Sequence, residues 1–257
     1  MLHFLTILLA VFLVVHTSSA LSYPTPSSTC HRGSNRLFLD TADVSIWEEL
    51  LPLGIFHGVT CNPTLLERAI QACTVANLHV LARTCLVMPF CQEFMCQSWG
   101  ATCDEMYETG LQLSQPDRQR IVIKVPVTAE GTKAAALLID SGVRVCLTAC
   151  YDQKQAIVAA GLGAEYLAPY LGRMTDAGKD GLDECRQMEY IARGMGSTTR
   201  ILVASIRDVQ SMADLMEDGM DTFTFNPDVA RQLFSEPLTE EAANEFEKAA
   251  ERGASSK

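Results

Sequence analysis

After Arg36 the chain alternates between short apolar segments and longer segments with helical periodicity, and this alternation constrains the fold most. The apolar segments have the length and composition of strands, and they cover residues 36–40, 58–61, 94–99, 121–125, 143–148, 166–169, 201–205 and 222–225. Helix patterns cover residues 44–51, 103–113, 131–139, 153–160, 182–192, 209–217, 228–234 and 240–252. Strands that alternate with helices form a parallel sheet, and eight βα units in about 220 residues predict an α/β fold, a compact (β/α)₈ TIM barrel.

A doubly wound open sheet is the alternative architecture, because the same alternation also builds open parallel sheets. The chain contains no GxGxxG or GxxxxGK[ST] loop, so nothing in the sequence supports the nucleotide site that such sheets often carry. The segment 69–89 fits neither the strand pattern nor the helix pattern clearly.

Composition limits the classes of partner. The 257 residues are 48% hydrophobic, which is enough for one large core. There are 20 basic and 31 acidic side chains, and the net charge of −11 argues against a nucleic-acid-binding surface. An anionic ligand would need a local basic pocket. The 10 cysteines include no CxxC pair, which argues against a zinc ribbon or a thioredoxin-type site.

The first 35 residues are typical of a targeting segment rather than of a folded domain. Residues 2–15 form an apolar run broken only by His3 and Thr6, and small residues follow at 18–20, so residues 1–20 are predicted to be a signal peptide. The run is too short for a comfortable transmembrane helix, so no stable membrane anchor is expected. Residues 21–35 contain no Asp or Glu and are rich in Ser and Thr, as in a transit segment or a flexible linker. The folded domain is then expected at residues 36–257.

Polar residues stand at or just after the ends of seven predicted strands. They are Asp40, Asn62, Gln97, Lys124, Thr148, Tyr170 and Ser205. In a (β/α)₈ barrel the active site is built where the strands end and the βα loops begin, so these side chains are the candidates for chemistry.

Lys124 is the most informative of these residues. It lies in an apolar strand and shares a face with Val122, and in a barrel that face points to the interior. Burial disfavours the ammonium form, and a pKa lowered by about 3 units would make the neutral amine a major species near pH 7.4. A neutral amine can attack a carbonyl and form a Schiff base. The alternative is a lysine that reaches past the strand end or pairs with a carboxylate.

The other candidates also have structural alternatives. Asp40 could assist proton transfer, or it could cap a helix or form a turn. Gln97 needs hydrogen-bond partners if it is buried, which substrate hydroxyls or an ordered water could supply. Asn62 could simply hold the turn before Pro63, and Thr148 could satisfy a backbone group.

Five segments in collinear order carry a resemblance to a known family. They are LFLDTAD (37–43), GVTCNPT (58–64), IKVPVTAEG (123–131), AEYLAPYLGR (164–173) and ASIR (204–207). Together they resemble the transaldolase family, particularly its small fructose 6-phosphate aldolase-like branch, over residues from about Arg36 to the C-terminal helix.

The resemblance implies a class I aldolase that needs no metal or other cofactor and acts in carbohydrate metabolism, as in the pentose phosphate pathway. Lys124 would form the Schiff base, and Asp40 would be the acid/base carboxylate. The residues matched to the ketose moiety or the catalytic water are Thr60, Asn62 and Thr148, and those matched to the phosphate are Ser205, Arg173 and Arg207. Surface ion pairing is the alternative for the two arginines.

Two positions bear on the branch of the family. Transaldolases proper usually have Glu and Phe where this chain has Gln97 and Tyr170, and the fructose 6-phosphate aldolase type has Gln and Tyr. The resemblance therefore implies cleavage or transfer of a dihydroxyacetone unit, with fructose 6-phosphate, glyceraldehyde 3-phosphate and erythrose 4-phosphate as candidate substrates. Members of this size commonly assemble, so a homo-oligomer is expected.

Location and function leave alternatives open. Sugar phosphates are internal metabolites, so a signal peptide on such an enzyme indicates an organelle reached through the endomembrane system, such as an algal plastid with extra membranes; a secreted protein is the alternative. A non-catalytic sugar-phosphate-binding barrel and a secreted or membrane-anchored interaction protein are the competing classes of function.

Overall fold

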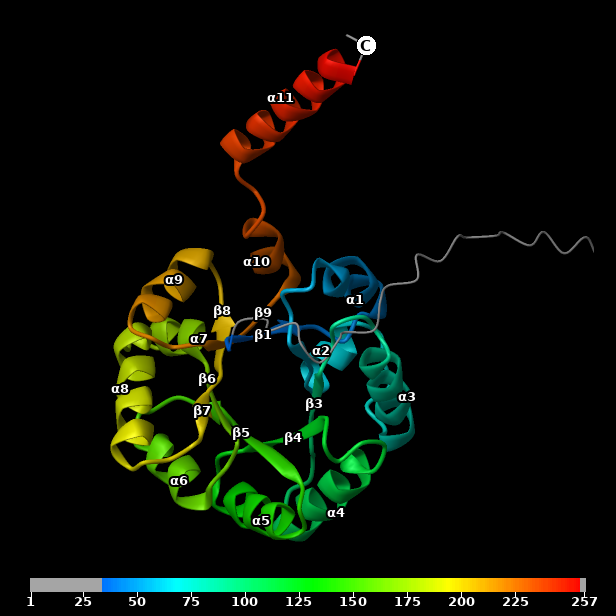
Figure 1. The fold of residues 1–257 in the computed structure, drawn as a ribbon. Coiled ribbons are helices and arrows are strands. Elements are labelled where there is room, and N and C mark those ends of the chain that lie inside the picture. The colour runs from blue at the N-terminus through cyan, green and yellow to red at the C-terminus, as the bar shows by residue number, and fades with distance from the viewer. Residues whose placement is uncertain (1–33, 255–257) are drawn as a thin grey trace, which may run out of the picture. The chain divides into compact units, whose positions relative to one another are not determined.

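In the computed structural model, residues 34–254 are described, and their strands form one parallel sheet that curves into a barrel (Figure 1). The strands are β1 (Arg36–Asp40), β2 (Gly58–Thr60), β3 (Glu93–Gln97), β4 (Ile121–Pro126), β5 (Arg144–Cys150), β6 (Tyr166–Pro169), β7 (Arg200–Ile201), β8 (Val203–Ile206) and β9 (Thr222–Phe225). Their order in the sheet is β7-β6-β5-β4-β3-β2-β1-β9-β8. All the predicted strands are present, with ends shifted by at most two residues.

The barrel closes because β7 and β8 are two halves of one strand, interrupted at Leu202. β7 pairs with β6 and β8 pairs with β9, so the two ends of the strand order are joined through a single residue. The Leu202 amide donates to the Leu167 carbonyl at 2.7 Å, and a parallel bridge links Tyr170 to Ala204. The (β/α)₈ barrel is therefore confirmed, and the doubly wound open sheet is wrong.

Most helices lie around the outside of the barrel (Figure 1). They are α1 (Val44–Leu50), η1 (Leu51–Leu53), α2 (Pro63–Arg68), α3 (Val75–Leu86), α4 (Cys103–Ser114), α5 (Ala129–Asp140), α6 (Gln155–Leu162), α7 (Leu171–Asp176), α8 (Gly181–Gly194), α9 (Val209–Glu217), α10 (Pro227–Gln232) and α11 (Pro237–Ala254). The segment without a clear pattern contains α3, whose buried residues Leu78, Leu81, Ala82 and Cys85 follow helical spacing after an N-cap at Thr74. No residue of α11 is buried.

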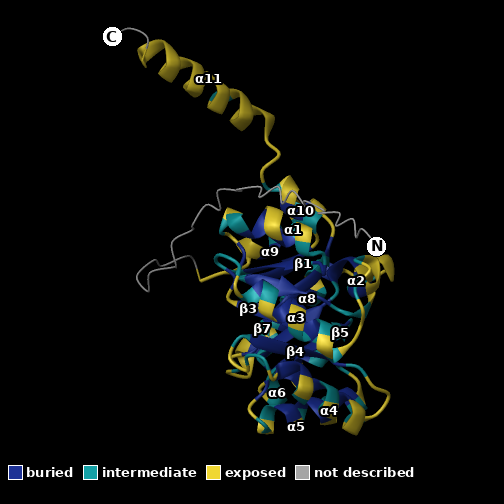
Figure 2. Cartoon of the chain, turned by 90° about the vertical axis from the view of Figure 1, so that its right-hand side faces the viewer, coloured by how far each residue is buried: buried dark blue, intermediate teal, exposed yellow. Residues whose placement is uncertain are grey.

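The core has two layers, one on each side of the sheet. Figure 2 shows the strands largely buried and the surrounding helices with both buried and exposed residues. The larger layer lies between the strands and the surrounding helices. The smaller fills the barrel and includes Phe38, Met95, Val122, Tyr166 and Leu202. Along β4 the isoleucines and Val125 join the outer layer, while Val122 lies in the inner one. Lys124 lies on the same face of β4 as Val122, so its side chain points to the barrel interior as predicted.

A cluster of charged side chains occupies the N-terminal ends of the strands, at the end of the barrel opposite to Lys124. This basal ion cluster consists of Arg36, His57, Glu93, Arg144, Glu165 and Tyr166. Glu93 is buried at its centre: Arg144 Nη2 lies 2.6 Å from Glu93 Oε1, and the Tyr166 hydroxyl donates to Glu93 Oε2 at 2.8 Å. Every buried charge here faces an opposite charge, as burial requires.

The predicted signal peptide and most of the transit-like segment lie outside the described residues, so both stay predictions. Between residues 34 and 254, no helix combines the length and the apolar character needed to cross a bilayer.

Candidate active site

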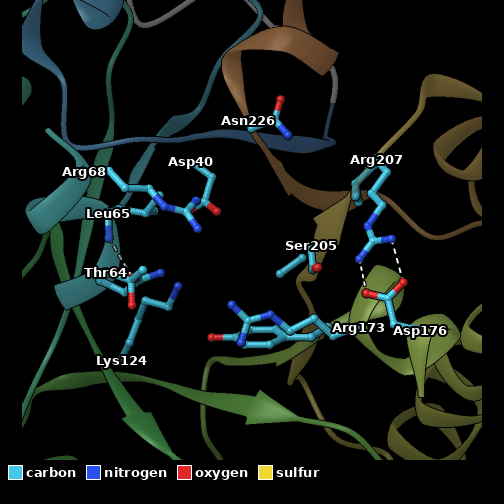
Figure 3. A pocket seen from close by; sticks show the side chains of 14 residues that line it. Asp40, Thr64, Leu65, Arg68, Lys124, Arg173, Asp176, Ser205, Arg207 and Asn226 are labelled. Atoms are coloured by element: carbon cyan, nitrogen blue, oxygen red, sulfur yellow. Dashed lines mark hydrogen bonds and ion pairs between the residues drawn. The ribbon is translucent and has the colours of Figure 1, made fainter.

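A cavity of about 400 Å³ lies at the C-terminal ends of the strands, within the size range of ligand pockets (Figure 3). The sequence-predicted residues that line it are Asp40, Asn62, Lys124, Tyr170, Arg173, Ser205 and Arg207. Thr60, Gln97 and Thr148 do not line it, and each lies next to a residue that does. Residues from five strand ends are thus brought to one place.

Lys124 is 2% exposed, and it reaches the cavity from the interior face of β4. Burial acts to lower the pKa of its amine, but the Tyr170 hydroxyl and the Asp40 carboxylate outweigh burial and raise this pKa above its ordinary value. The expected lowering is therefore wrong for this structure. Both neighbouring groups therefore favour the ammonium form of Lys124.

Asp40 ends β1 and is held by a chain of hydroxyl groups. Thr60 Oγ1 donates to Asp40 Oδ1 at 2.6 Å, and the same hydroxyl lies 2.6 Å from Thr224 Oγ1. Thr60 therefore positions the carboxylate rather than lining the cavity itself. The alternative of a helix cap is wrong for Asp40, because the neighbouring helix α1 is capped by Asp43.

Tyr170 follows β6, and its hydroxyl lies 3.0 Å from Thr148 Oγ1 on the adjacent strand β5. This contact fixes the phenol so that its oxygen faces the same cavity as Lys124. Gln97 is the register partner of Lys124 across β3 and β4, so the two side chains lie on the same face of the sheet. Gln97 thus lies on the strand next to Lys124, and Tyr170 follows β6, which is separated from β4 by β5.

Asn62 caps a helix and also lines the cavity. Its Oδ1 accepts a hydrogen bond from the Leu65 amide at 3.0 Å and caps α2, which begins at Pro63. The amide nitrogen has no protein partner among the described residues, and the side chain still lines the cavity. Asn62 can therefore cap the helix and donate to a ligand at the same time.

The end of the cavity near β8 carries the polar groups suited to a phosphate. Ser205 lines it with a backbone φ of 58°, a left-handed conformation that is uncommon outside glycine. Gly172 approaches so closely that a Cβ there would lie 2.5 Å from the Ser205 carbonyl and 2.8 Å from Arg207 Nε. Only glycine permits this contact between the start of α7 and the end of β8.

The two arginines at this end differ in their partners. Arg173 Nη1 donates to the Tyr151 hydroxyl at 3.2 Å, and its guanidinium lies 5.1 Å from the centre of the Tyr170 ring. Arg207 pairs with Asp176 through both terminal nitrogens (Figure 3), and this pairing lowers the pKa of Asp176. Ion pairing, the alternative interpretation, is thus observed for Arg207, although it also lines the cavity.

Four further polar residues line the cavity and are not among those predicted from the sequence: Thr64, Arg68, Asp176 and Asn226. Arg68 points into it from the last turn of α2, and no partner for its guanidinium is found in the described part of the chain (Figure 3). In the NPTLLER segment Arg68 lies less than two turns after α2 begins at Pro63, and this short distance from the strand end is the available signal. Asp176 is the last residue of α7, and it pairs with Arg207, which is distant in sequence.

The cavity lining has an excess of positive charge, whereas the whole protein is negatively charged. Lys124, Arg68, Arg173 and Arg207 outnumber the carboxylates Asp40 and Asp176, in a chain of net charge −11. A site of this kind attracts an anion to one place while the rest of the surface repels it. Across residues 34–254 no cluster of three or more His, Cys, Asp or Glu side chains suits a metal ion. The cavity can therefore present an amine, a carboxylate and a set of anion-binding arginines to one ligand.

Comparisons with known proteins agree with this arrangement. Residues 97–257 match the family model described as "Transaldolase/Fructose-6-phosphate aldolase". The chain is 32% identical over 211 residues to a protein named "Probable transaldolase" from Caulobacter vibrioides, covering 82% of this chain and 94% of the relative. It is 33% identical over 213 residues to a "Probable transaldolase" from Phenylobacterium zucineum and 32% identical over 219 residues to one from Bacillus cereus, covering 82% of this chain and 94% and 95% of those relatives.

Proposed function

Because the chain belongs to the transaldolase/fructose-6-phosphate aldolase family, we propose that it transfers or cleaves a dihydroxyacetone unit of sugar phosphates through a Schiff base on Lys124. The observation that carries the proposal is the buried lysine whose amine reaches a cavity. Asp40 and three arginines line the same cavity: Arg68, Arg173 and Arg207. Nothing in the comparisons supports the non-catalytic barrel.

The first half of the proposed reaction builds the covalent intermediate. Lys124 gives up its proton, and its amine attacks the C2 carbonyl of the ketose phosphate; loss of water leaves a protonated Schiff base. Asp40, which holds the lysine as an ammonium before reaction, is placed to exchange protons with it and with the substrate hydroxyls. The positive Schiff base serves as the electron sink, so the proposed step needs no metal ion.

The second half breaks and remakes a carbon–carbon bond. Removal of the proton from the C4 hydroxyl by Asp40 cleaves the C3–C4 bond, releases the aldose phosphate and leaves an enamine on Lys124. The enamine then either attacks an acceptor aldehyde phosphate, which is transfer, or takes a proton and is hydrolysed to free dihydroxyacetone, which is cleavage. Tyr170, held by Thr148, is the group that we propose to position the water for hydrolysis.

Acceptor dependence tests the proposed function. The purified chain should release glyceraldehyde 3-phosphate from fructose 6-phosphate, and adding erythrose 4-phosphate should separate transfer from cleavage. A protein that forms neither product with either mixture, while folded, would overturn the proposal.

Tyr170→Phe should shift this balance from cleavage toward transfer. Without the hydroxyl the water loses its partner, so acceptor-independent cleavage should fall by about 10²-fold while transfer is largely retained. Tyr107→Phe is the control, because the Tyr107 hydroxyl contacts Ser141 between α4 and α5, away from the cavity lining. Equal losses in both rates in Tyr170→Phe would contradict the role assigned to the phenol.

Arg173→Gln should weaken binding of phosphorylated aldehydes selectively. Loss of a charged hydrogen bond to phosphate should raise the KM for glyceraldehyde 3-phosphate by about 10–100-fold. The KM for unphosphorylated glyceraldehyde should change little, which distinguishes phosphate binding from general damage. Arg186→Gln is the matched control, since Arg186 pairs with Asp218 outside the cavity. A similar rise for both aldehydes would argue against a phosphate contact.

A further inference from the structure

Two buried thiols lie in contact at the C-terminal end of α3. Cys85 Sγ and Cys91 Sγ are 3.2 Å apart, and the two residues are 0% and 2% exposed. A disulfide has an S–S distance of about 2.05 Å, so an approach of about 1 Å would join these sulfurs. No other two cysteine sulfurs are in contact within residues 34–254.

The backbone around the pair is held in place by groups other than the thiols. Arg120 Nη2 donates to the Leu86 carbonyl at 3.0 Å and to the Cys91 carbonyl at 2.7 Å, so one guanidinium ties both ends of the 87–91 loop. The Met88 amide also bonds to the Cys85 carbonyl at 3.0 Å. The two cysteines are thus brought together by the fold, and a bond between them requires little movement of the main chain.

The pair is separate from the proposed active site. It lies at the N-terminal end of β3, whereas the cavity opens at the C-terminal ends of the strands, and no residue of the 85–91 segment lines the cavity. In such barrels the N-terminal end of the strands serves stability rather than chemistry. A crosslink here would therefore tie α3 to β3 without touching Lys124.

We propose that Cys85 and Cys91 form a disulfide when the chain meets a low-molecular-weight disulfide such as oxidised glutathione. The Cys91 thiolate attacks one sulfur of that disulfide and releases one small thiol; the Cys85 thiolate then attacks Cys91 Sγ and releases the second. The two protein thiols lose two electrons and two protons, and the small disulfide is reduced to two thiols.

Burial determines when this exchange is fast. Burial, together with the neighbouring Cys91, raises the pKa of the Cys85 thiol, and thiolates rather than thiols carry out the exchange. Val87 is 82% exposed, whereas Cys91 at the end of the same loop is buried, so the loop must open locally before either thiol meets a small disulfide. Exchange is fast while the chain folds or the loop opens, and slow in the closed protein.

The test compares full-length chain refolded in a mixture of reduced and oxidised glutathione with chain refolded in reductant. Thiols are alkylated under denaturing conditions without reduction, and fragment masses locate any crosslink. We expect one crosslink, between Cys85 and Cys91, that is lost in Cys91→Ser and retained in Cys73→Ser, since Cys73 is an exposed cysteine outside the pair.

Thermal unfolding of the wild type supplies a measurement that does not depend on the variants folding. The oxidised form should unfold about 4 °C or more above the reduced form, and reductant should remove the difference. Full alkylation of Cys85 and Cys91 after oxidative refolding would overturn the proposal, as would crosslinks spread over Cys73 and Cys103. Activity toward fructose 6-phosphate should be the same in both forms, so this outcome is independent of the proposed function.

Discussion

Lys124→Met should lower kcat/KM for cleavage and for transfer by about 10⁴-fold or more, because the methionine cannot form the Schiff base on which every proposed later step depends. The same substitution should eliminate the product of borohydride trapping. With fructose 6-phosphate and borohydride, the wild type should gain a three-carbon adduct that peptide mass spectrometry places on Lys124.

Two controls separate loss of chemistry from loss of fold. Lys133→Met changes an exposed lysine that pairs with Glu130 on α5, and it should keep both activity and the Lys124 adduct. Lys124→Met leaves the Asp40 carboxylate without its buried cationic neighbour, so thermal unfolding of the variant measures whether it is still folded at the assay temperature. Trapping on another lysine, or activity that survives in Lys124→Met, would disprove the mechanism.

The raised pKa of Lys124 adds a pH dependence to this result. Below that pKa the neutral amine fraction increases about tenfold for each pH unit, so the single-turnover rate of adduct formation should rise between about pH 7 and pH 9. Asp40→Asn removes the charge that stabilises the ammonium, and the rise should begin at lower pH in that variant. An unchanged pH profile would show that Asp40 does not hold the lysine proton.

The inward position of Lys124 was predictable because strand alternation is a local property of the sequence. Residues 121–126 show it directly, and the structure places Val122 in the barrel interior as expected. The pKa of Lys124 was not predictable in the same way. Its direction depends on Asp40 and Tyr170, which stand 84 and 46 positions away and are brought together only by closure of the barrel.

Three other features of the structure were not predictable from the sequence, because they depend on short elements or on contacts between distant residues. The break of the seventh barrel strand at Leu202 has no marker in an apolar segment, since it changes the pairing partner and not the composition. α7 has six residues, too few to show a helical period. The pairing of Arg207 with Asp176 joins the residue after β8 to the last residue of α7, so the sequence indicates the arginine but not its partner.

Glu93→Gln should cause the largest loss of stability among single substitutions in the basal ion cluster. The change leaves Arg36, Arg144 and the Tyr166 hydroxyl facing a neutral amide where a buried carboxylate had been. Breaking a buried ion pair from one side is costly, and we expect the free energy of unfolding to fall by about 3 kcal/mol and the thermal midpoint by about 10 °C. Denaturant unfolding near pH 7 measures the first quantity.

The pH dependence of this effect follows from the pKa of Glu93. Burial alone would raise that pKa, but His57 and Arg144 outweigh it and lower the pKa to about 2. A carboxyl with a folded-state pKa below its unfolded value of about 4.3 stabilises the fold above that value, and the contribution is lost as pH falls toward about 2. The stability difference between wild type and Glu93→Gln should therefore be constant above about pH 5 and shrink steadily below it.

Glu49→Gln is the control for this argument. Glu49 forms an exposed pair with Arg231 at 2.8 Å, and its loss should leave the unfolding midpoint nearly unchanged. A Glu93→Gln protein as stable as the wild type at pH 7 would show that the cluster is dispensable. A deficit that stays constant down to pH 2 would show that lost packing, rather than lost charge, causes the destabilisation. A deficit confined to higher pH would place the stabilising charge on the Glu93 carboxylate.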